Sequence, residues 1–141
     1  MTATNLYHVG VLVTDLDDAM AQFAEVLGVT FGEPRTVPAV IEEGGITTER
    51  PLHVVYSLEG PPFLELIEAQ EGGVWGAHHG EGLHHIGSWQ TGLASRLAGM
   101  AAAGVTPEAV MTIDGTLIAA YLEPSHLHQT RVELVSPRSE R

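Results

Sequence analysis

The sequence contains no cysteine and no lysine, so all six of its basic residues are arginines. Without cysteine the chain can form neither disulfides nor thiolate metal sites, and it has no thiol nucleophile. Without lysine it cannot carry out Schiff-base chemistry. The shortage of positive charge leaves a net charge of −12, which argues against nucleic acid or an anionic membrane as a partner.

Long apolar runs are also missing, and none approaches the roughly 20 residues that a membrane-spanning helix needs. The first residues lack the basic and then apolar pattern of a signal peptide, so we expect a cytoplasmic protein. A chain of 141 residues with 44% hydrophobic residues can bury a core without disulfides. We therefore expect residues 1–141 to form a single domain.

What the sequence does contain is an internal repeat with an offset of 77 residues. At this offset His8 falls on His85 and Gly10 falls on Gly87, and each histidine lies in an apolar, strand-like run. Further matches, with a changed offset toward the end of each half, are Thr14 with Thr91, Leu16 with Leu93, Tyr56 with Tyr121, and Glu65 with Glu133. The chain therefore consists of two copies of one unit.

Each copy is predicted to be a βαβββ module, the first at about 6–68 and the second at about 83–136. The first should contain a strand at 6–13, a helix from an N-cap at Thr14 or Asp15 to Gly28, a strand near 29–38, a polar loop through 42–45, and strands at 52–58 and 63–68. The second should contain a strand at 83–90, a helix at 93–103, and strands at 109–113, 116–122 and 131–136. The glycine-rich segment 69–82 is the connector. The expected fold class is α+β, with the modules paired about a pseudo-twofold axis around a cleft.

Four polar side chains occupy equivalent positions in the two copies, and each lies within an apolar, strand-like run: His8, Glu65, His85 and Glu133. A carboxylate among apolar residues in mid-strand is costly unless it is paired or binds a cation. If the modules pack about a pseudo-twofold axis, the four side chains converge, so we predict a site for one divalent metal ion. Nitrogen and oxygen donors suit Zn, Ni, Co, Mn or Fe, and the donor set does not choose among them.

Strand alternation sorts the neighbours of these residues into two faces. It places Tyr7 on the face opposite His8, and His84 on the face opposite His85, where a structural role is expected. Taken alone, a histidine in an apolar strand is usually a hydrogen-bonded core residue, and a mid-strand glutamate usually faces solvent. The remaining candidates are expected to have no role in the site. Trp75 should pack against the sheet, and surface positions are expected for His78, His79, His126 and His128.

Four segments resemble the vicinal oxygen chelate superfamily, which includes glyoxalase I, methylmalonyl-CoA epimerase, extradiol dioxygenases and bleomycin resistance proteins. They are His8-Val9-Gly10-Val11-Leu12-Val13-Thr14-Asp15, Phe63-Leu64-Glu65-Leu66-Ile67-Glu68, Leu83-His84-His85-Ile86-Gly87 and Val132-Glu133-Leu134-Val135-Ser136-Pro137. The resemblance implies a paired βαβββ fold with a divalent metal in the cleft, held by His8, Glu65, His85 and Glu133. This set is similar to that of bacterial glyoxalase I, whereas epimerases commonly carry Gln at the position of Glu65.

The residues and the resemblance together predict a metal-dependent enzyme that acts on a small carbonyl substrate. The metal would polarise the carbonyl, and Glu133 or Glu65 would transfer a proton, as in a lyase or an isomerase such as an epimerase. One alternative is a non-catalytic protein that binds an antibiotic or another hydrophobic ligand. Another is an Fe(II) dioxygenase, against which the fourth ligand argues. We expect a small-molecule substrate and a homodimer.

Overall fold

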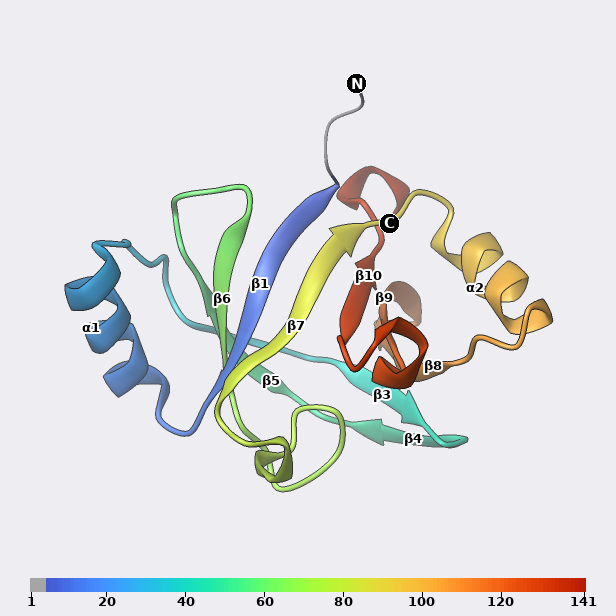
Figure 1. The fold of residues 1–141 in the computed structure, drawn as a ribbon, viewed down its shortest axis with the longest axis horizontal. Helices are drawn as coiled ribbons and strands as arrows, with labels where there is room; N and C mark the ends of the chain where they lie inside the picture. Colours follow the sequence, from blue (N-terminus) through green and yellow to red (C-terminus); the bar gives the residue numbers. More distant parts are fainter. Residues whose placement is uncertain (1–4) are drawn as a thin grey trace.

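In the computed structural model, which describes residues 5–141, a ten-stranded sheet curves around a cleft and carries two α-helices on its outside (Figure 1). The elements in chain order are β1 (Leu6–Val13), α1 (Leu16–Leu27), β2 (Arg35–Val37), β3 (Val40–Glu43), β4 (Ile46–Glu49), β5 (Leu52–Tyr56), β6 (Phe63–Glu68), β7 (Gly82–Trp89), α2 (Leu93–Ala102), β8 (Pro107–Ile113), β9 (Thr116–Leu122) and β10 (Val132–Val135). Short 3-10 helices lie at Ala77–His79, Pro124–Leu127 and Arg138–Glu140. No helix in the described part of the chain is long and apolar enough to cross a membrane.

The order of the strands, β2-β5-β6-β1-β7-β10-β9-β8-β3-β4, confirms the two βαβββ modules. Each module places its first and last strands side by side in parallel, β1 with β6 and β7 with β10. The modules meet where β1 pairs with β7 in antiparallel fashion, and there His8 lies opposite Gly87 while Gly10 lies opposite His85. This reciprocal register is what a pseudo-twofold axis between the two strands requires.

One prediction for the first module is wrong. Instead of a long strand near 29–38 and a loop through 42–45, β2 has three residues, and β3 and β4 form a hairpin that turns at Gly44 and Gly45. Every residue of β4 is exposed, so this strand carries no alternating apolar signal that a sequence reading could detect.

The hairpin completes the cleft. β3 pairs with β8 at the edge of the second module, whereas β2 pairs with β5 at the edge of the first. Only residues 38–39 separate β2 from β3 along the chain. The two edges of the curved sheet are thus joined by this short link as well as by the central β1–β7 pairing.

The helices cover the outer faces of the two modules, as Figure 1 shows. The Asp15 carboxylate caps α1 by accepting a hydrogen bond from the Asp18 N–H, and Gly28 ends it with a φ of 70°, which confirms both predicted caps. Leu16 of α1 packs with Val11 and Leu66, while Leu93 of α2 packs with Leu122 and Leu134.

The inner face of the sheet holds the largest apolar cluster, which includes Leu12, Ile41, Ile67 and Tyr121. Trp75, from the connector, is fully buried in this cluster, which confirms its predicted packing role. His8, Glu65, His85 and Glu133 are buried too, although they are polar. This polar group within an apolar interior is the feature that needs a chemical explanation.

Candidate metal centre

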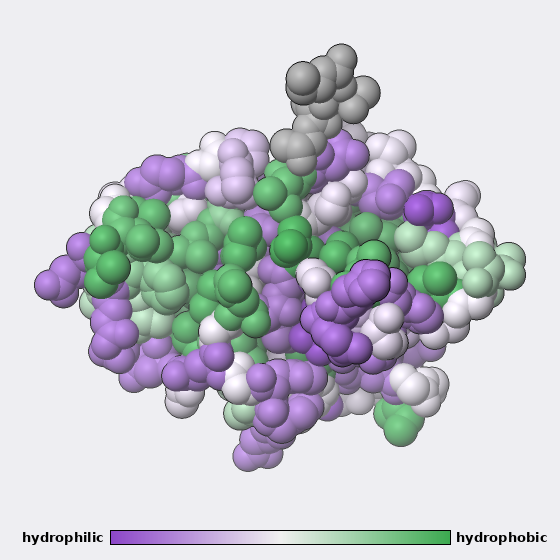
Figure 2. All heavy atoms as spheres, in the orientation of Figure 1, coloured by the Kyte–Doolittle hydropathy of each residue, from purple (hydrophilic) through white to green (hydrophobic). Residues whose placement is uncertain are grey.

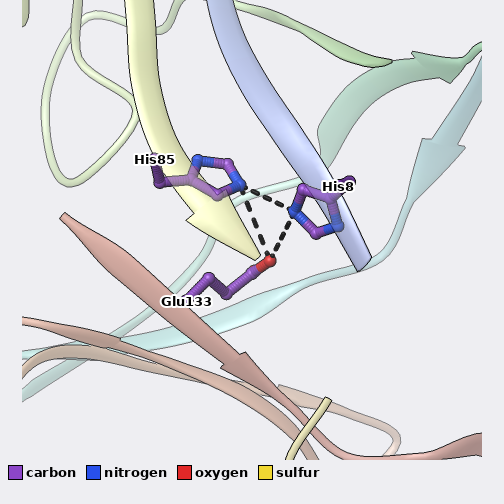
Figure 3. Close-up of side chains that lie close together, drawn as sticks. All are labelled: His8, His85 and Glu133. Atoms are coloured by element: carbon purple, nitrogen blue, oxygen red, sulfur yellow. Dashed lines mark hydrogen bonds and ion pairs between the residues drawn. The ribbon is translucent and has the colours of Figure 1, made fainter. Parts of the chain in front are cut away.

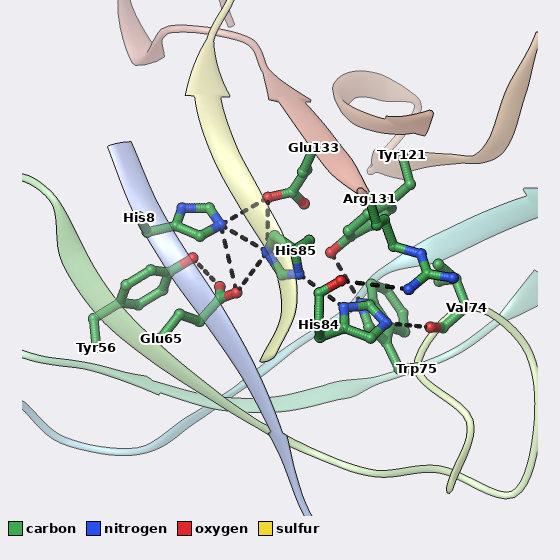
Figure 4. A network of polar contacts seen from close by, with 10 residues as sticks. All are labelled: His8, Tyr56, Glu65, Val74, Trp75, His84, His85, Tyr121, Arg131 and Glu133. Carbon is green, nitrogen blue, oxygen red and sulfur yellow. Dashed lines mark hydrogen bonds and ion pairs between the residues drawn. The ribbon is translucent and has the colours of Figure 1, made fainter. Parts of the chain in front are cut away.

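The four side chains of the predicted site come from four neighbouring strands, in the order β6, β1, β7 and β10. Each is at most 5% exposed, and their polar ends point toward one another across the centre of the sheet (Figure 4). The set is Glu65, His8, His85 and Glu133.

The nitrogen and oxygen atoms at the centre are close enough to share one ion. The two histidine Nε2 atoms are 2.8 Å apart, and Glu133 Oε1 lies 3.0 Å from His8 Nε2 and 3.6 Å from His85 Nε2 (Figure 3). The donor atoms of these three residues all lie within 4.8 Å of one another. Glu65 Oε1 approaches from the other side, 3.2 Å from His85 Nε2 and 3.5 Å from His8 Nε2.

The unpaired polar atoms fit a cation. Within the described chain, Glu65 Oε1 is buried without a hydrogen-bond partner although it faces both imidazoles. Burying two carboxylates in an apolar interior is costly unless positive charge compensates them. A divalent ion would satisfy these donors, and mixed nitrogen and oxygen ligands suit Zn, Ni, Co, Mn or Fe.

The glycines that follow each histidine make room for the opposite ring. A Cβ atom placed on Gly10 would overlap the ring of His85, and a Cβ atom on Gly87 would overlap the ring of His8. The repeated His-x-Gly pattern is therefore one packing unit, in which each module supplies a ring to the other module's glycine.

Each glutamate is also held by a tyrosine directly opposite it on the neighbouring antiparallel strand. The Tyr56 hydroxyl donates a hydrogen bond to Glu65 Oε2 (Figure 4). Tyr121 is hydrogen-bonded to Glu133 in the same way. The indole N–H of Trp75 donates to the Tyr121 hydroxyl at 3.0 Å, which leaves the tyrosine's own proton for Glu133. The repeat pairs Tyr56 with Tyr121 in the sequence, but the pattern alone assigns the two tyrosines no role.

Burial, reinforced by the charge of the glutamates, raises the pKa of both tyrosines well above its usual value. Both hydroxyls consequently remain donors. Burial alone would raise the pKa of Glu65 too, but the charge of His8, the close approach of His85 and the hydrogen bond from Tyr56 outweigh it and hold that pKa at about 2. Glu65 is thus a carboxylate at neutral pH, as a metal ligand must be.

The prediction that His84 lies on the face opposite His85 is wrong. Gly10 pairs with His85 while Val11 pairs with Leu83, so His84 is an extra residue that forms a β-bulge in β7. The bulge breaks the alternation and turns His84 inward, where it is buried and its Nδ1 lies 2.8 Å from Nδ1 of His85.

His84 sets the orientation of the proton on His85. Its Nε2 lies 2.7 Å from the Val74 carbonyl, which can only accept, so Nε2 carries the hydrogen. Burial and the neighbouring His85 lower the pKa of His84 to about 3, so His84 is neutral and its Nδ1 accepts from the Nδ1–H of His85. His85 is left with a lone pair on Nε2, pointing at the centre (Figure 4).

A second bulge occurs at Tyr7, which the repeat pairs with His84. Leu6 pairs with Ser88 and His8 with Gly87, so Tyr7 is the extra residue on β1. Its ring consequently turns to the cleft side and stacks on Trp89 at 3.9 Å between centroids, which corrects the prediction that it faces away from His8. No hydrogen bond reaches Nδ1 of His8 from the described residues, so only His85 has a supporting chain.

Two adjoining cavities lead to this centre. An inner cavity of about 310 Å³ includes His8, Glu65 and Glu133 in its lining, and apolar side chains such as Met111 and Ile118 form part of its walls. An outer cavity of about 570 Å³ adjoins it.

The histidines predicted to lie at the surface are exposed, as expected: His78, His79, His126 and His128.

A family profile described as the Glyoxalase/Bleomycin resistance protein/Dioxygenase superfamily matches residues 7–121, and the chain belongs to this family. The resemblance to vicinal oxygen chelate proteins is thereby confirmed. A search of curated proteins found no match.

Solved structures agree in fold. Methylmalonyl-CoA epimerase in complex with methylmalonyl-CoA and NH4+ is 20% identical, with a TM-score of 0.67 over 98% of this chain and 97% of that one. The epimerase from Mycobacterium tuberculosis is 19% identical, with a TM-score of 0.68 over 97% and 93% of the two chains. A hypothetical protein from Bacillus halodurans C-125 is 19% identical, with a TM-score of 0.68 over 97% and 96%. At these identities the similarity establishes the fold alone.

Proposed function

We propose that the protein is a metal-dependent enzyme that acts on a small carbonyl substrate through proton transfer by a glutamate. One observation carries this proposal: two imidazoles and two carboxylates converge in a buried position next to a cavity, with a carboxylate oxygen left unpaired. His8, Glu65, His85 and Glu133 would hold the ion. Structural similarity to methylmalonyl-CoA epimerases supports an isomerase, and the His/Glu/His/Glu donor set supports a glyoxalase-like lyase.

A divalent ion bound there would act as a Lewis acid toward a carbonyl oxygen and make a neighbouring C–H bond more acidic. Residues of the chain would contact the substrate and transfer the proton. Apolar side chains of the inner cavity, such as Met111 and Ile118, contact the substrate. Glu133 or Glu65 accepts the proton and returns it, and the opposite tyrosine holds each carboxylate in place.

Exchange of substrate hydrogen with solvent deuterium, followed by NMR, tests the proton transfer. The metal-loaded protein is expected to exchange the hydrogen next to the carbonyl, and the substitution that removes the base, E133Q or E65Q, is expected to slow exchange about 100-fold or more. E123Q, at an exposed loop position, is the matched control. Exchange that continues unchanged in both site variants would refute the mechanism.

The class of reaction follows from the substrate. Adducts of 2-oxoaldehydes are the test substrates for a lyase, and acyl compounds that racemise next to the carbonyl are those for an isomerase. Turnover of one group and not the other assigns the class.

A non-catalytic binding protein is the second candidate, and the aromatic outer cavity favours it because such a cavity can hold a flat ligand without metal. A ligand-induced rise in melting temperature that persists in chelator, without turnover, would support this candidate. A dioxygenase is not proposed, because Glu65 lies as close to the histidines as Glu133 does.

We also propose that the protein is a homodimer. Leu64, Val9, Ile86 and Val132 form a continuous row across β6, β1, β7 and β10 on the outer face, since each pairs with the next in register. Figure 2 shows apolar surface over these strands between the helices, and Leu83 and Ile86 are 84% and 40% exposed. Light scattering is expected to give the mass of two chains for the native protein and of one chain for I86E; a native monomer would contradict the proposal.

A further inference from the structure

The outer cavity concentrates residue types that are scarce elsewhere in the chain. Four aromatic side chains line it, although the whole sequence has only three tyrosines, three phenylalanines and two tryptophans. Tyr7 is central to the group: its ring stacks on Trp89 at 3.9 Å and lies 6.0 Å from those of Tyr56 and Phe63. This wall is suited to a flat, apolar group.

Two of the six arginines line the same cavity. Arg35 lies over the ring of Tyr56, at 5.8 Å from the ring centroid, and Arg138 is close enough to Tyr7 to lower its pKa, against the larger effect of burial. Among residues 5–141 neither arginine has a carboxylate partner, whereas Arg50 and Arg131 pair with Glu43 and Glu108. In a chain with a net charge of −12, two unpaired guanidinium groups at one cavity form a local site for an anion.

Arg35 and Arg138 lie at the boundary between the two cavities. Arg35, Arg138, Tyr7 and Tyr56 line both cavities, whereas the glutamates and His8 line only the inner one. An anionic group held at this boundary would leave one part of the ligand directed to the centre and another part beside the aromatic wall.

From this arrangement we propose that the substrate is a small carbonyl acid with a single carboxylate and a flat apolar substituent. Arg35 and Arg138 bind the carboxylate, the aromatic wall receives the substituent, and the carbonyl part enters the inner cavity. This inference rests on the proposed function for the role of the carbonyl, but the carboxylate and aromatic contacts do not require the metal.

The same observations argue against a polyanionic carrier as the main source of affinity. A coenzyme A thioester carries several phosphate charges, which many cationic groups would have to offset in a chain without lysine. The similar epimerase structure holds methylmalonyl-CoA, so the two ligand classes can be compared directly on this protein.

Calorimetric titration of the full chain, with and without its divalent ion, tests the inference. The probes are phenylpyruvate, which has ring, carbonyl and carboxylate, its neutral amide, and pyruvate, which lacks the ring. Phenylpyruvate is expected to bind about tenfold or more tightly than its amide and than pyruvate. The amide lacks the charged hydrogen bond and pyruvate lacks the buried ring, and each of these contacts contributes at least a factor of about ten to affinity. R35Q and R138Q should abolish the preference over the amide, and W89L the preference over pyruvate.

R96Q is the matched control, since Arg96 is exposed on α2 and lines neither cavity. Equal binding of acid and amide, an equal loss in R96Q, or tighter binding of methylmalonyl-CoA than of phenylpyruvate would overturn the inference. Metal titration of the same samples separates the two proposals. Arginine-dependent binding without any metal site would refute the proposed function alone, and a metal site without charge preference would refute this inference alone.

Discussion

The ring of His85 occupies the space above Gly10, where a side chain on that residue would stand. The reciprocal contact, between His8 and Gly87, completes a pair of contacts about the pseudo-twofold axis. Position and packing of the two histidines are therefore set by residues of the opposite module. The centre exists only when both modules are folded against each other.

Replacing Gly10 with alanine is expected to displace His85, because the new methyl group would overlap its ring. Crowding of this kind costs about 1–3 kcal/mol in the free energy of unfolding. Metal affinity is expected to fall about tenfold or more, since the ring is no longer held in position. Urea unfolding and a metal titration measure the two effects.

The control for this substitution is G99A. Nothing lies within 4 Å of a Cβ on Gly99, which is inside α2, so alanine should raise stability by up to about 1 kcal/mol. If G10A were as benign as G99A, the packing role of the glycine would be wrong.

His84 gives a second prediction, since it is the only described side chain that hydrogen-bonds to Nδ1 of His85. H84F removes both the acceptor for that N–H and the donor to Val74. Metal affinity is expected to drop about 10–100-fold, the usual cost of losing the group that orients a ligating histidine. H84Q can accept and donate at similar positions, so it is expected to restore part of the affinity.

Nitrogen NMR of the metal-free protein supplies a readout that a purely structural role would not change. The native protein should show the proton of His85 on Nδ1, and H84F should show a mixture of the two tautomers. A single unchanged tautomer in H84F would contradict the account, as would an equal loss of affinity in the exposed-site variant H126Q.

Stability of the metal-free protein is expected to depend on His84 in acid. Burial and the neighbouring His85 lower the folded-state pKa of His84 to about 3, below its usual 6.5. Between these values the unfolded chain binds the proton and the folded chain does not, so stability falls as the pH drops from 6.5 toward 3. The advantage of the native protein over H84Q should shrink over this window in urea unfolding. An advantage that is constant or grows in acid would refute the assignment.

Much of the fold could be predicted because equivalent residues of the repeat have equivalent surroundings in the two modules. His8 and His85, with glycine two positions later, identify the same strand in both modules, and the glycine caps mark the helix ends. The convergence of four side chains follows once the two modules are related by symmetry.

The bulges could not be predicted in the same way. Alternation assumes that paired strands stay in register, and a bulge is a property of the pair that neither strand reveals alone. Alternation consequently places Tyr7 and His84 on the wrong face, although the repeat relates them. The β3–β4 hairpin cannot be predicted for another reason, since its outer strand is exposed on both sides.

Titration of the metal-free protein with divalent ions is the decisive test of the metal site. We expect one ion per chain for the native protein. Affinity should be lowered about 100-fold or more when a ligand is removed in E133Q or E65Q, and it should be unchanged in E123Q. A native protein that binds no divalent ion above the background of a protein-free titration, or binding that E133Q and E65Q leave intact, would refute the site.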